Sequence, residues 1–203
     1  MQHAFLSIDT IKGESHDDKH KDWIEIQSFS QDLLQPRSAT ASTSGGTTAA
    51  RVNLSPIEIT KSIDLASTAL NQAASNGTTF PKAQIQFMRA DKDGNAINYY
   101  TVELLNVLVH RVTTTVDKEG MPQEVVQLSF GAIKWTYQQQ KPEGGVGGKT
   151  VAQWSATKNI PNYTVCCCVA AMAPRAPSQS DRRARPGTAL PLMHRCRPHG
   201  CRT

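Results

Sequence analysis

Five residues near the end of the strand-rich part of the chain, VGGKT at 146 to 150, end in Gly-Lys-Thr and raise the question of a phosphate-binding loop. A Walker A loop has a glycine five positions before its last glycine, because the loop wraps backbone N–H groups around a phosphate. In this sequence that position is Glu143, whose carboxylate would repel a phosphate, and no helical pattern follows. The spacing therefore favours a flexible glycine loop over a nucleotide site.

Two other stretches have residue types that bind metals. The run DKDGN at 91 to 95 has its glycine fourth and Val102 at position twelve, whereas a calcium loop needs glycine sixth and glutamate twelfth. His16 and His20 lie four residues apart, which on a helix would make a metal pair, but acids and lysines crowd the same stretch. We predict a hairpin turn for the first and a solvated charged loop for the second.

Near the C-terminus four zinc-competent side chains fall within eight residues: His194, Cys196, His199 and Cys201. So few residues separate them that closing around one metal would strain the chain, and a chance cluster is the simpler interpretation. No cysteine precedes residue 160, and neither His110 nor His3 has a Ser or Asp partner at a telling spacing. The sequence shows no enzyme signature, and we predict no catalytic, metal or cofactor site.

Charge and cysteine divide the chain near residue 160. Residues 1–160 contain 15 Lys and Arg against 16 Asp and Glu, whereas residues 161–203 contain seven arginines, one acid and all five cysteines. This second segment is rich in Arg, Pro and Cys and lacks apolar periodicity, so its composition predicts a disordered basic tail. The abrupt change suggests a frameshifted or read-through end. The arginines offer nonspecific charge but no interleaved aromatics, so we expect no specific nucleic-acid partner.

Neither end of the chain predicts membrane insertion. The apolar run from Val165 to Ala173 is too short to span a bilayer, and prolines bracket it. The N-terminal stretch MQHAFLSIDTIKGE lacks a basic region and places Asp9 where a signal peptide needs unbroken apolar residues. We therefore expect no Sec signal peptide.

Most of the first 140 residues alternate between apolar and polar side chains, which predicts strands. The expected strands cover residues 4–9, 23–30 with a bulge near Gln27, 56–62, 83–89, 98–116 and 123–140. The stretch 98–116 is about twice the length of an ordinary strand. It must therefore bend or pass from one sheet to another, and Asn106 lies in its middle.

One segment changes period and predicts a helix. From Asp64 as a cap to Asn76-Gly77 as an end, apolar residues recur at spacings of three to five, namely Leu65, Ala69, Leu70, Ala73 and Ala74. Residues 35–52 are small, polar and glycine-containing, which predicts a long mobile loop. The fold class predicted is mainly β, with about seven strands in a two-sheet β-barrel or sandwich, one flanking α-helix and the tail.

Several separate stretches resemble one family in the same order along the chain. FLSIDTIKGESHDDKHKDWIEIQSFS, ITKSIDLASTALNQAASNG, AQIQFMRADKDGNAINYYTVELLNVLV and VQLSFGAIKWTYQQQ resemble the Hcp proteins (hemolysin-coregulated proteins), which build the inner tube of the bacterial type VI secretion system. The resemblance covers roughly residues 4 to 158. It implies a non-enzymatic tube-forming domain at 1–160, with a barrel-like fold, that assembles into stacked hexameric rings and carries effectors. Its implied partners are itself and the sheath, spike and effector proteins, in the bacterial cytoplasm and then outside the cell without a Sec signal.

The resemblance also assigns a role to the long loop, because that family uses the corresponding segment for contacts between subunits and rings. The implied interface residues within 36–50 are Pro36, Arg37, Ser38, Thr40, Ser42, Gly45, Gly46 and Thr47. A loop without a partner remains an alternative for this segment. For the whole chain, the alternatives are a tail-tube protein of contractile phages, which has a similar architecture, and a stand-alone β-barrel binding module.

Overall fold

The computed structural model describes residues 2–36, 51–90, 94, 96–116, 120–141 and 146–165. All of them belong to the first of two compact units, Met1–Cys167, and the second unit, Cys168–Thr203, lies outside the described residues. Residues 166–203 of the tail, with the His/Cys cluster, and the predicted interface residues other than Pro36 therefore lie outside the described part of the chain.

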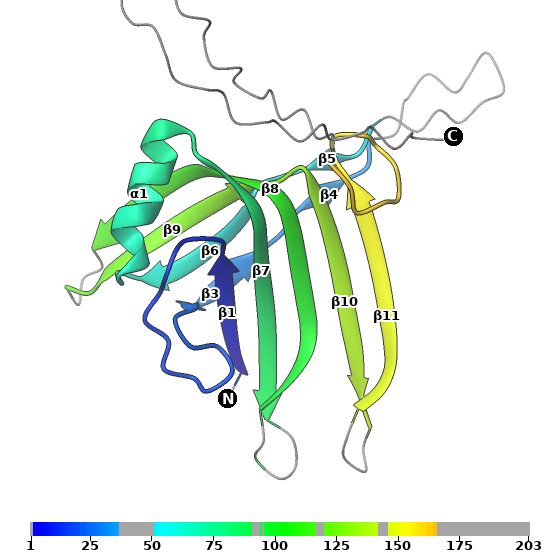
Figure 1. Cartoon of the computed structure of the whole chain (residues 1–203), viewed down its shortest axis with the longest axis horizontal. Coiled ribbons are helices and arrows are strands. Elements are labelled where there is room, and N and C mark those ends of the chain that lie inside the picture. The colour runs from blue at the N-terminus through cyan, green and yellow to red at the C-terminus, as the bar shows by residue number, and fades with distance from the viewer. Residues whose placement is uncertain are drawn as a thin grey trace, which may run out of the picture. The chain divides into compact units, whose positions relative to one another are not determined.

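Strands make up most of the described residues, with a single helix among them (Figure 1). The elements are β1 Gln2–Ile8, β2 Ile24–Ile26, β3 Ser28–Ser30, β4 Leu33–Leu34, β5 Asn53–Leu54, β6 Ile57–Ser62, α1 Ala66–Asn76, β7 Thr79–Ala90, β8 Ala96–Val116, β9 Pro122–Ser129, β10 Ala132–Gln140 and β11 Val146–Ser155. The predicted class, mainly β with one helix, is confirmed.

Nine of the strands form one curled antiparallel sheet. Its order is β2-β1-β7-β8-β9-β6-β3, with β10 paired to β8 and β11 paired to β10, while β4 and β5 form a separate pair. The two ends of the main order, β2 and β3, are consecutive in the chain and are separated by Gln27, whose N–H donates to the Thr60 carbonyl at 2.8 Å. The hydrogen-bonded ladder does not close. At Gln27 the chain instead changes partner from β1 to β6, which confirms the predicted irregularity.

The long strand β8 pairs with strands in two differently directed parts of this sheet. Its first part pairs with β7 on one side and with β10 on the other, and its last part pairs with β9. Asn106 lies between these parts with φ 55°, and the register with β9 shifts between Val109 and Arg111. The strand therefore bends where the sequence predicts, and β9 and β6 cross β7 and β8 at an angle (Figure 1).

The helix α1 packs on the sheet through a narrow face. Its buried residues are Ala66, Ser67, Leu70 and Ala73. Gly77 ends the helix in the left-handed region, which confirms the predicted end. At the start the N-cap is Leu65 and not the predicted Asp64, although Asp64 Oδ1 accepts a hydrogen bond from the Ala66 N–H at 3.0 Å. The predicted face was wrong for Leu65 and Ala69, which are exposed, because the helix begins one residue later and presents Ala66 and Ser67 to the core.

Two strand predictions were also wrong. The segment 123–140 is two strands, because the chain turns at Phe130-Gly131, where the Gly131 N–H donates to the Leu105 carbonyl at 2.9 Å. Residues 146–150, predicted as a flexible loop, begin β11 and pair with β10. An available partner edge decides strand formation more than local propensity does, so a glycine-rich segment can form a strand beside β10.

A substitution at Gly13 tests how closely the loop between β1 and β2 is packed. A Cβ there would lie 2.3 Å from the carbonyl oxygen of Trp23, so Gly13→Ala must displace backbone. We expect a loss of about 1–3 kcal/mol in the free energy of unfolding, measured by thermal or urea denaturation. The control is Gly148→Ala, where the nearest atom lies 3.9 Å away. A Gly13→Ala variant as stable as this control would contradict the packing.

Candidate assembly surface

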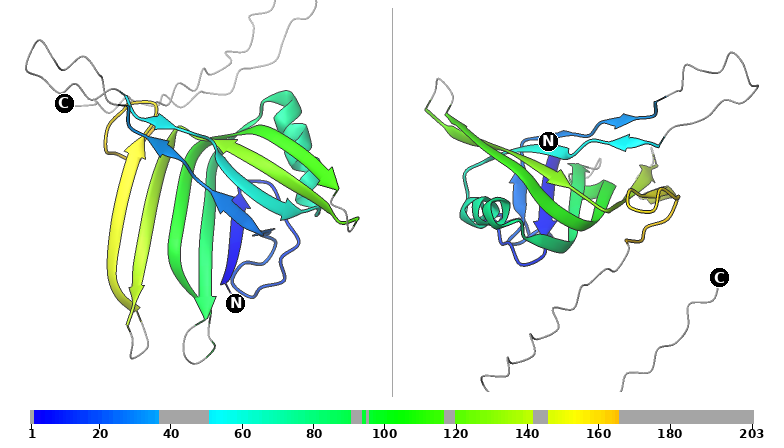
Figure 2. Two further views of the ribbon diagram at one scale, coloured as in Figure 1. Left: turned by 180° about the vertical axis from the view of Figure 1, so that it is seen from behind. Right: turned by 90° about the horizontal axis from the view of Figure 1, so that it is seen from above.

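A two-stranded arm flanks the predicted interface loop. In the arm, β4 and β5 pair through Leu33 with Leu54 and Leu34 with Asn53, and they run side by side away from β3 and β6 (Figure 2). Leu33 is 49% exposed and Leu34 55%, and Pro36 at the end of the arm is half-buried. A two-residue ladder has little stability of its own, and these apolar side chains lack cover from the residues that the structure describes. The arm is therefore a candidate contact surface.

The base of the arm is attached to the main sheet. Trp135 Nε1 on β10 donates to Gln31 Oε1 at 3.0 Å. The guanidinium of Arg51 donates to the carbonyl of Ala156, in the turn after β11. These contacts fix where the arm leaves the sheet.

The strand β11 offers a second candidate contact. It is ten residues long and pairs with β10, and within the described ladder its other edge has no partner strand. Val151 in this strand is 49% exposed. A long unpaired edge is a template for pairing with another chain. Within the described ranges, both the arm and this edge therefore lack cover.

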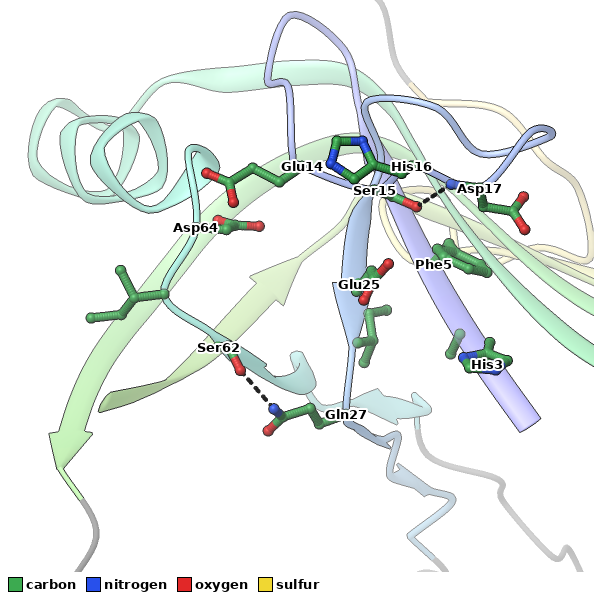
Figure 3. A pocket seen from close by; sticks show the side chains of 13 residues that line it. His3, Phe5, Glu14, Ser15, His16, Asp17, Glu25, Gln27, Ser62 and Asp64 are labelled. Atoms are coloured by element: carbon green, nitrogen blue, oxygen red, sulfur yellow. Dashed lines mark hydrogen bonds between the residues drawn. The ribbon is translucent and has the colours of Figure 1, made fainter. Parts of the chain in front are cut away.

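A groove opens beside the seam where β2 passes into β3 (Figure 3). Its main cavity has a volume of about 620 Å³ and lies between β1–β2, the loop after β1, and the segment joining β6 to α1. Gln27 Nε2 donates to Ser62 Oγ at 2.7 Å at one end, and the Leu65 N–H donates to Glu14 Oε1 at 2.9 Å at the other. A second cavity of about 310 Å³ shares His3, Ala4, Ile26 and Gln27 with the first and continues to Phe29 and Phe87. We call the two cavities together the seam groove.

A buried ion cluster lies behind this groove, at the start of α1. Lys61 is fully buried, and its Nζ lies 2.6 Å from Asp64 Oδ1, 3.0 Å from Glu124 Oε2 and 2.9 Å from Ser67 Oγ. Ser67 in turn donates to Glu124 at 2.7 Å. Lys61 and Glu124 are direct partners in the β6–β9 ladder, so the cluster joins two strands to the helix. Sequence reasoning missed it, although Lys61 occupies the inward position of the alternating stretch IEITKS.

The loop after β1 is held in place by His20, which corrects the prediction of a solvated loop. His20 is 2% exposed, stacks on Phe5 at 4.4 Å between ring centroids and meets the edge of Trp23 at 4.9 Å. Its Nδ1–H donates to Asp17 Oδ1 at 2.6 Å, and its Nε2 lies 2.9 Å from Gln86 Oε1. The hydrogen bond from His20 lowers the pKa of Asp17. Stacking and hydrogen bonds thus fix this wall of the seam groove.

The face of the sheet that points away from the core carries a row of charges. Glu103 on β8 lies between Lys82 on β7, 3.3 Å away, and Lys134 on β10, with which it forms an ion pair. Burial alone would raise the pKa of Glu103, but the hydrogen bonds and charges of the two lysines outweigh it and hold the pKa below its ordinary value. Lys134 Nζ lies 5.5 Å from the centroid of the Tyr163 ring. Burial and the charge of Glu103 raise the pKa of the Tyr163 hydroxyl.

The other residues singled out from the sequence are not brought together. His3, His16 and His110 are exposed, and Lys149 of the Gly-Lys-Thr run lies on β11. Within the described ranges, no group of three or more His, Cys, Asp or Glu side chains is arranged to hold a metal ion. The candidate surfaces in this part of the chain are the arm, the edge of β11 and the seam groove.

The combination of a curled sheet, one helix, a projecting arm and an open strand edge is typical of a subunit that assembles with others. Comparison with known proteins is consistent with that class. A family model described as "Type VI secretion system effector, Hcp" matches residues 5–137. "Protein hcp1" of Pseudomonas aeruginosa is 32% identical over 158 residues, which are 77% of this chain and 96% of that protein. The "Major exported protein" of the same organism is 28% identical over 133 residues, 62% of this chain and 75% of that protein.

Solved structures show the same likeness. A structure described as that of a type six secretion system protein has a TM-score of 0.72 and 28% identity, covering 79% of this chain and 99% of that one. Hcp1 from Salmonella typhimurium has a TM-score of 0.63 and 29% identity, covering 78% of this chain and 97% of its own. The chain belongs to the Hcp family of type VI secretion systems, as its sequence predicts.

The buried ion cluster predicts an asymmetry between single and double substitution. Lys61→Met leaves Glu124 buried without its cation, and we expect a loss of about 3–5 kcal/mol in the free energy of unfolding. Lys61→Met with Glu124→Met removes both charges and should recover much of that loss, as measured by urea denaturation. If the double variant were no more stable than the single one, an uncompensated buried charge would not be the cause.

The lowered carboxyl pKa values predict a loss of stability in acid. A carboxyl whose pKa is lowered by folding stabilises the fold above its unfolded pKa, and that stability disappears as the pH falls through the folded pKa. For Asp17 and Glu103 this places the loss below about pH 5. Glu103→Gln should therefore lower the stability at pH 7 and make the decline between pH 5 and pH 3 shallower, as measured by urea unfolding. An unchanged pH profile in that variant would contradict the ion pairs.

Proposed function

We propose that the chain is a tube subunit, and that its copies form hexameric rings that stack into the inner tube of a type VI secretion system and carry effectors out of the cell. The observation that carries this proposal is the likeness to type VI secretion and Hcp structures over 78–79% of this chain, in a domain whose described residues leave an apolar arm and a ten-residue strand edge uncovered. Assembly covers both features at once.

The position of these features favours a ring. The arm and the edge of β11 are different surfaces, so a contact that uses either one against another part of the next copy is heterologous. Heterologous contacts close into a ring when the rotation between copies divides a full turn. Pairing along the edge of β11 would extend the main sheet from one subunit to the next and remove the exposed edge.

Export and the further partners follow from the family and not from any site in the chain. One relative is called the "Major exported protein", which supports passage out of the cell. Within the described residues, no helix is long and apolar enough to cross a membrane. The sheath, spike and effector proteins are the proposed partners, and the proposed route starts in the bacterial cytoplasm without a Sec signal.

The proposed interface within residues 36–50 and the domain division near residue 160 belong to the same proposal. Residues 161–203 add a formal charge of +6 to each subunit, which would repel neighbouring tails in stacked rings at low salt. Tyr163 packs against Lys134, so a truncation that leaves the described domain intact ends after Val165.

The solution mass tests the proposed function. We expect the full chain to have about six times its subunit mass of 22.2 kDa by light scattering, and to show rings with a central hole by negative-stain imaging. The chain ending at Val165 should form the same rings with a weaker dependence on salt, because the tail charge is gone. A monomer in both forms, at high protein concentration, would overturn the proposal and favour a stand-alone binding module.

A further inference from the structure

The buried ion cluster at the start of α1 brings an amine and two carboxyl groups within reacting distance. Lys61 Nζ lies 3.0 Å from Glu124 Oε2 and 2.6 Å from Asp64 Oδ1. The side chains of Lys61 and Glu124 are both buried away from bulk water. In such surroundings an amine and a carboxyl can condense to an amide, because the product is neutral and two buried charges disappear.

The backbone and the neighbouring side chains hold the amine against the carboxyl of Glu124. Lys61 and Glu124 are direct partners in the β6–β9 ladder, so the register places their side chains together. Lys61 Nζ also donates to the carbonyl of Ser62 at 2.9 Å and to Ser67 Oγ at 2.9 Å. Fixing two reacting groups in contact lowers the entropic part of the barrier to their reaction.

Asp64 and Ser67 can carry the protons that a condensation must move. Asp64 Oδ1 is the oxygen nearest to Lys61 Nζ among the cluster's contacts, which suits a general base. Ser67 Oγ lies 3.4 Å from Asp64 Oδ1 and 2.7 Å from Glu124 Oε2, so its hydroxyl connects the two carboxyls. Asp64 also lines the larger cavity of the seam groove (Figure 3), which gives a released water a route to solvent.

We propose that Lys61 and Glu124 join after folding in an isopeptide bond, an amide between Lys61 Nζ and Glu124 Cδ, with Asp64 as the base. The ion cluster described above is the state before this step. The bond closes a covalent loop from residue 61 to residue 124, which contains α1, β7 and β8. Closing a loop of this length restricts the unfolded chain and so stabilises the fold.

The step balances without any other reactant. The ammonium of Lys61 first gives one proton to the carboxylate of Glu124, which leaves an amine and a carboxylic acid. The nitrogen lone pair then attacks Glu124 Cδ, and Asp64 accepts a second proton from the nitrogen as the C–N bond forms. Asp64 returns this proton through the Ser67 hydroxyl to the hydroxyl on Cδ, which leaves as water. One amide and one water result, and Asp64 is again a carboxylate.

Mass spectrometry of the full chain, kept folded at neutral pH and then denatured, tests the bond. We expect a chain lighter by the mass of one water. In a tryptic digest, cleavage after Lys61 should be lost, and the peptide 52–82 should be joined to the peptide 119–134. A chain of full mass that is cleaved after Lys61 would overturn the inference. A loss of water confined to the peptide 52–82 would place the bond at Asp64 and would also overturn it.

Three variants assign the roles. In Glu124→Gln the leaving group is ammonia, so the expected loss changes from the mass of water to that of ammonia. Lys61→Arg lacks the reactive amine and should keep its full mass. Asp64→Asn should form the bond about a hundredfold more slowly, because the base is removed. A Glu124→Gln chain that still loses water between these two peptides, or an Asp64→Asn chain that reacts at the wild-type rate, would contradict the assigned roles.

The chain contains its own control for burial. Lys134 and Glu103 are also direct cross-strand partners that form an ion pair, but they are partly exposed and Glu103 is shared with Lys82. We expect no bond between them in the same digest, and a bond there would overturn burial as the cause. The masses are read on denatured chains, so the result does not depend on the ring assembly proposed above.

Discussion

The whole arrangement depends on one constraint, which is that a single strand must serve two differently directed parts of a sheet. The strand β8 is 21 residues long and pairs with β7, β10 and β9. It does so by bending at Asn106, one of the few non-glycine residues in the left-handed region. Asparagine tolerates that conformation better than other non-glycine side chains do. The bend turns β9 and β6 across the sheet, and the curl brings the ends of the ladder together at Gln27.

The curl also explains why charged groups lie in the core beside α1. Where β6 ends and the helix begins, the polar end of the helix lies against two strands, and Lys61, Glu124, Asp64 and Ser67 satisfy one another there. Such a cluster adds little net stability, but it requires a defined geometry, because the loss of one partner leaves another charge buried without compensation. It fixes the start of α1, and with it the segment 62–64 that forms one wall of the seam groove.

Alternation and length predicted most of the strands and the bend in β8, and Asn76-Gly77 predicted the end of the helix, because these follow from local pattern and capping. The missed features all depend on partners distant in sequence. β11 is a strand because β10 offers an edge, and His20 is buried because Phe5 stacks on it and Gln86 lies within hydrogen-bond distance of its Nε2. The Lys61 cluster likewise needs the β6–β9 register. The groove has no sequence signal at all, since it arises from three segments that only the curl brings together.

A sheet that does not close has free strand edges, and proteins treat such edges in one of two ways. Charged residues, prolines or covering loops can prevent a free edge from pairing with another chain, or the edge can be used for association. Among the described residues, the loop that His20 holds covers part of one end, while the seam stays open and β11 has no second partner strand. The same sequence places exposed leucines on the β4–β5 arm. Such edges endanger a monomer by inviting aggregation, and they are useful to a subunit whose contacts are different surfaces that close into a ring.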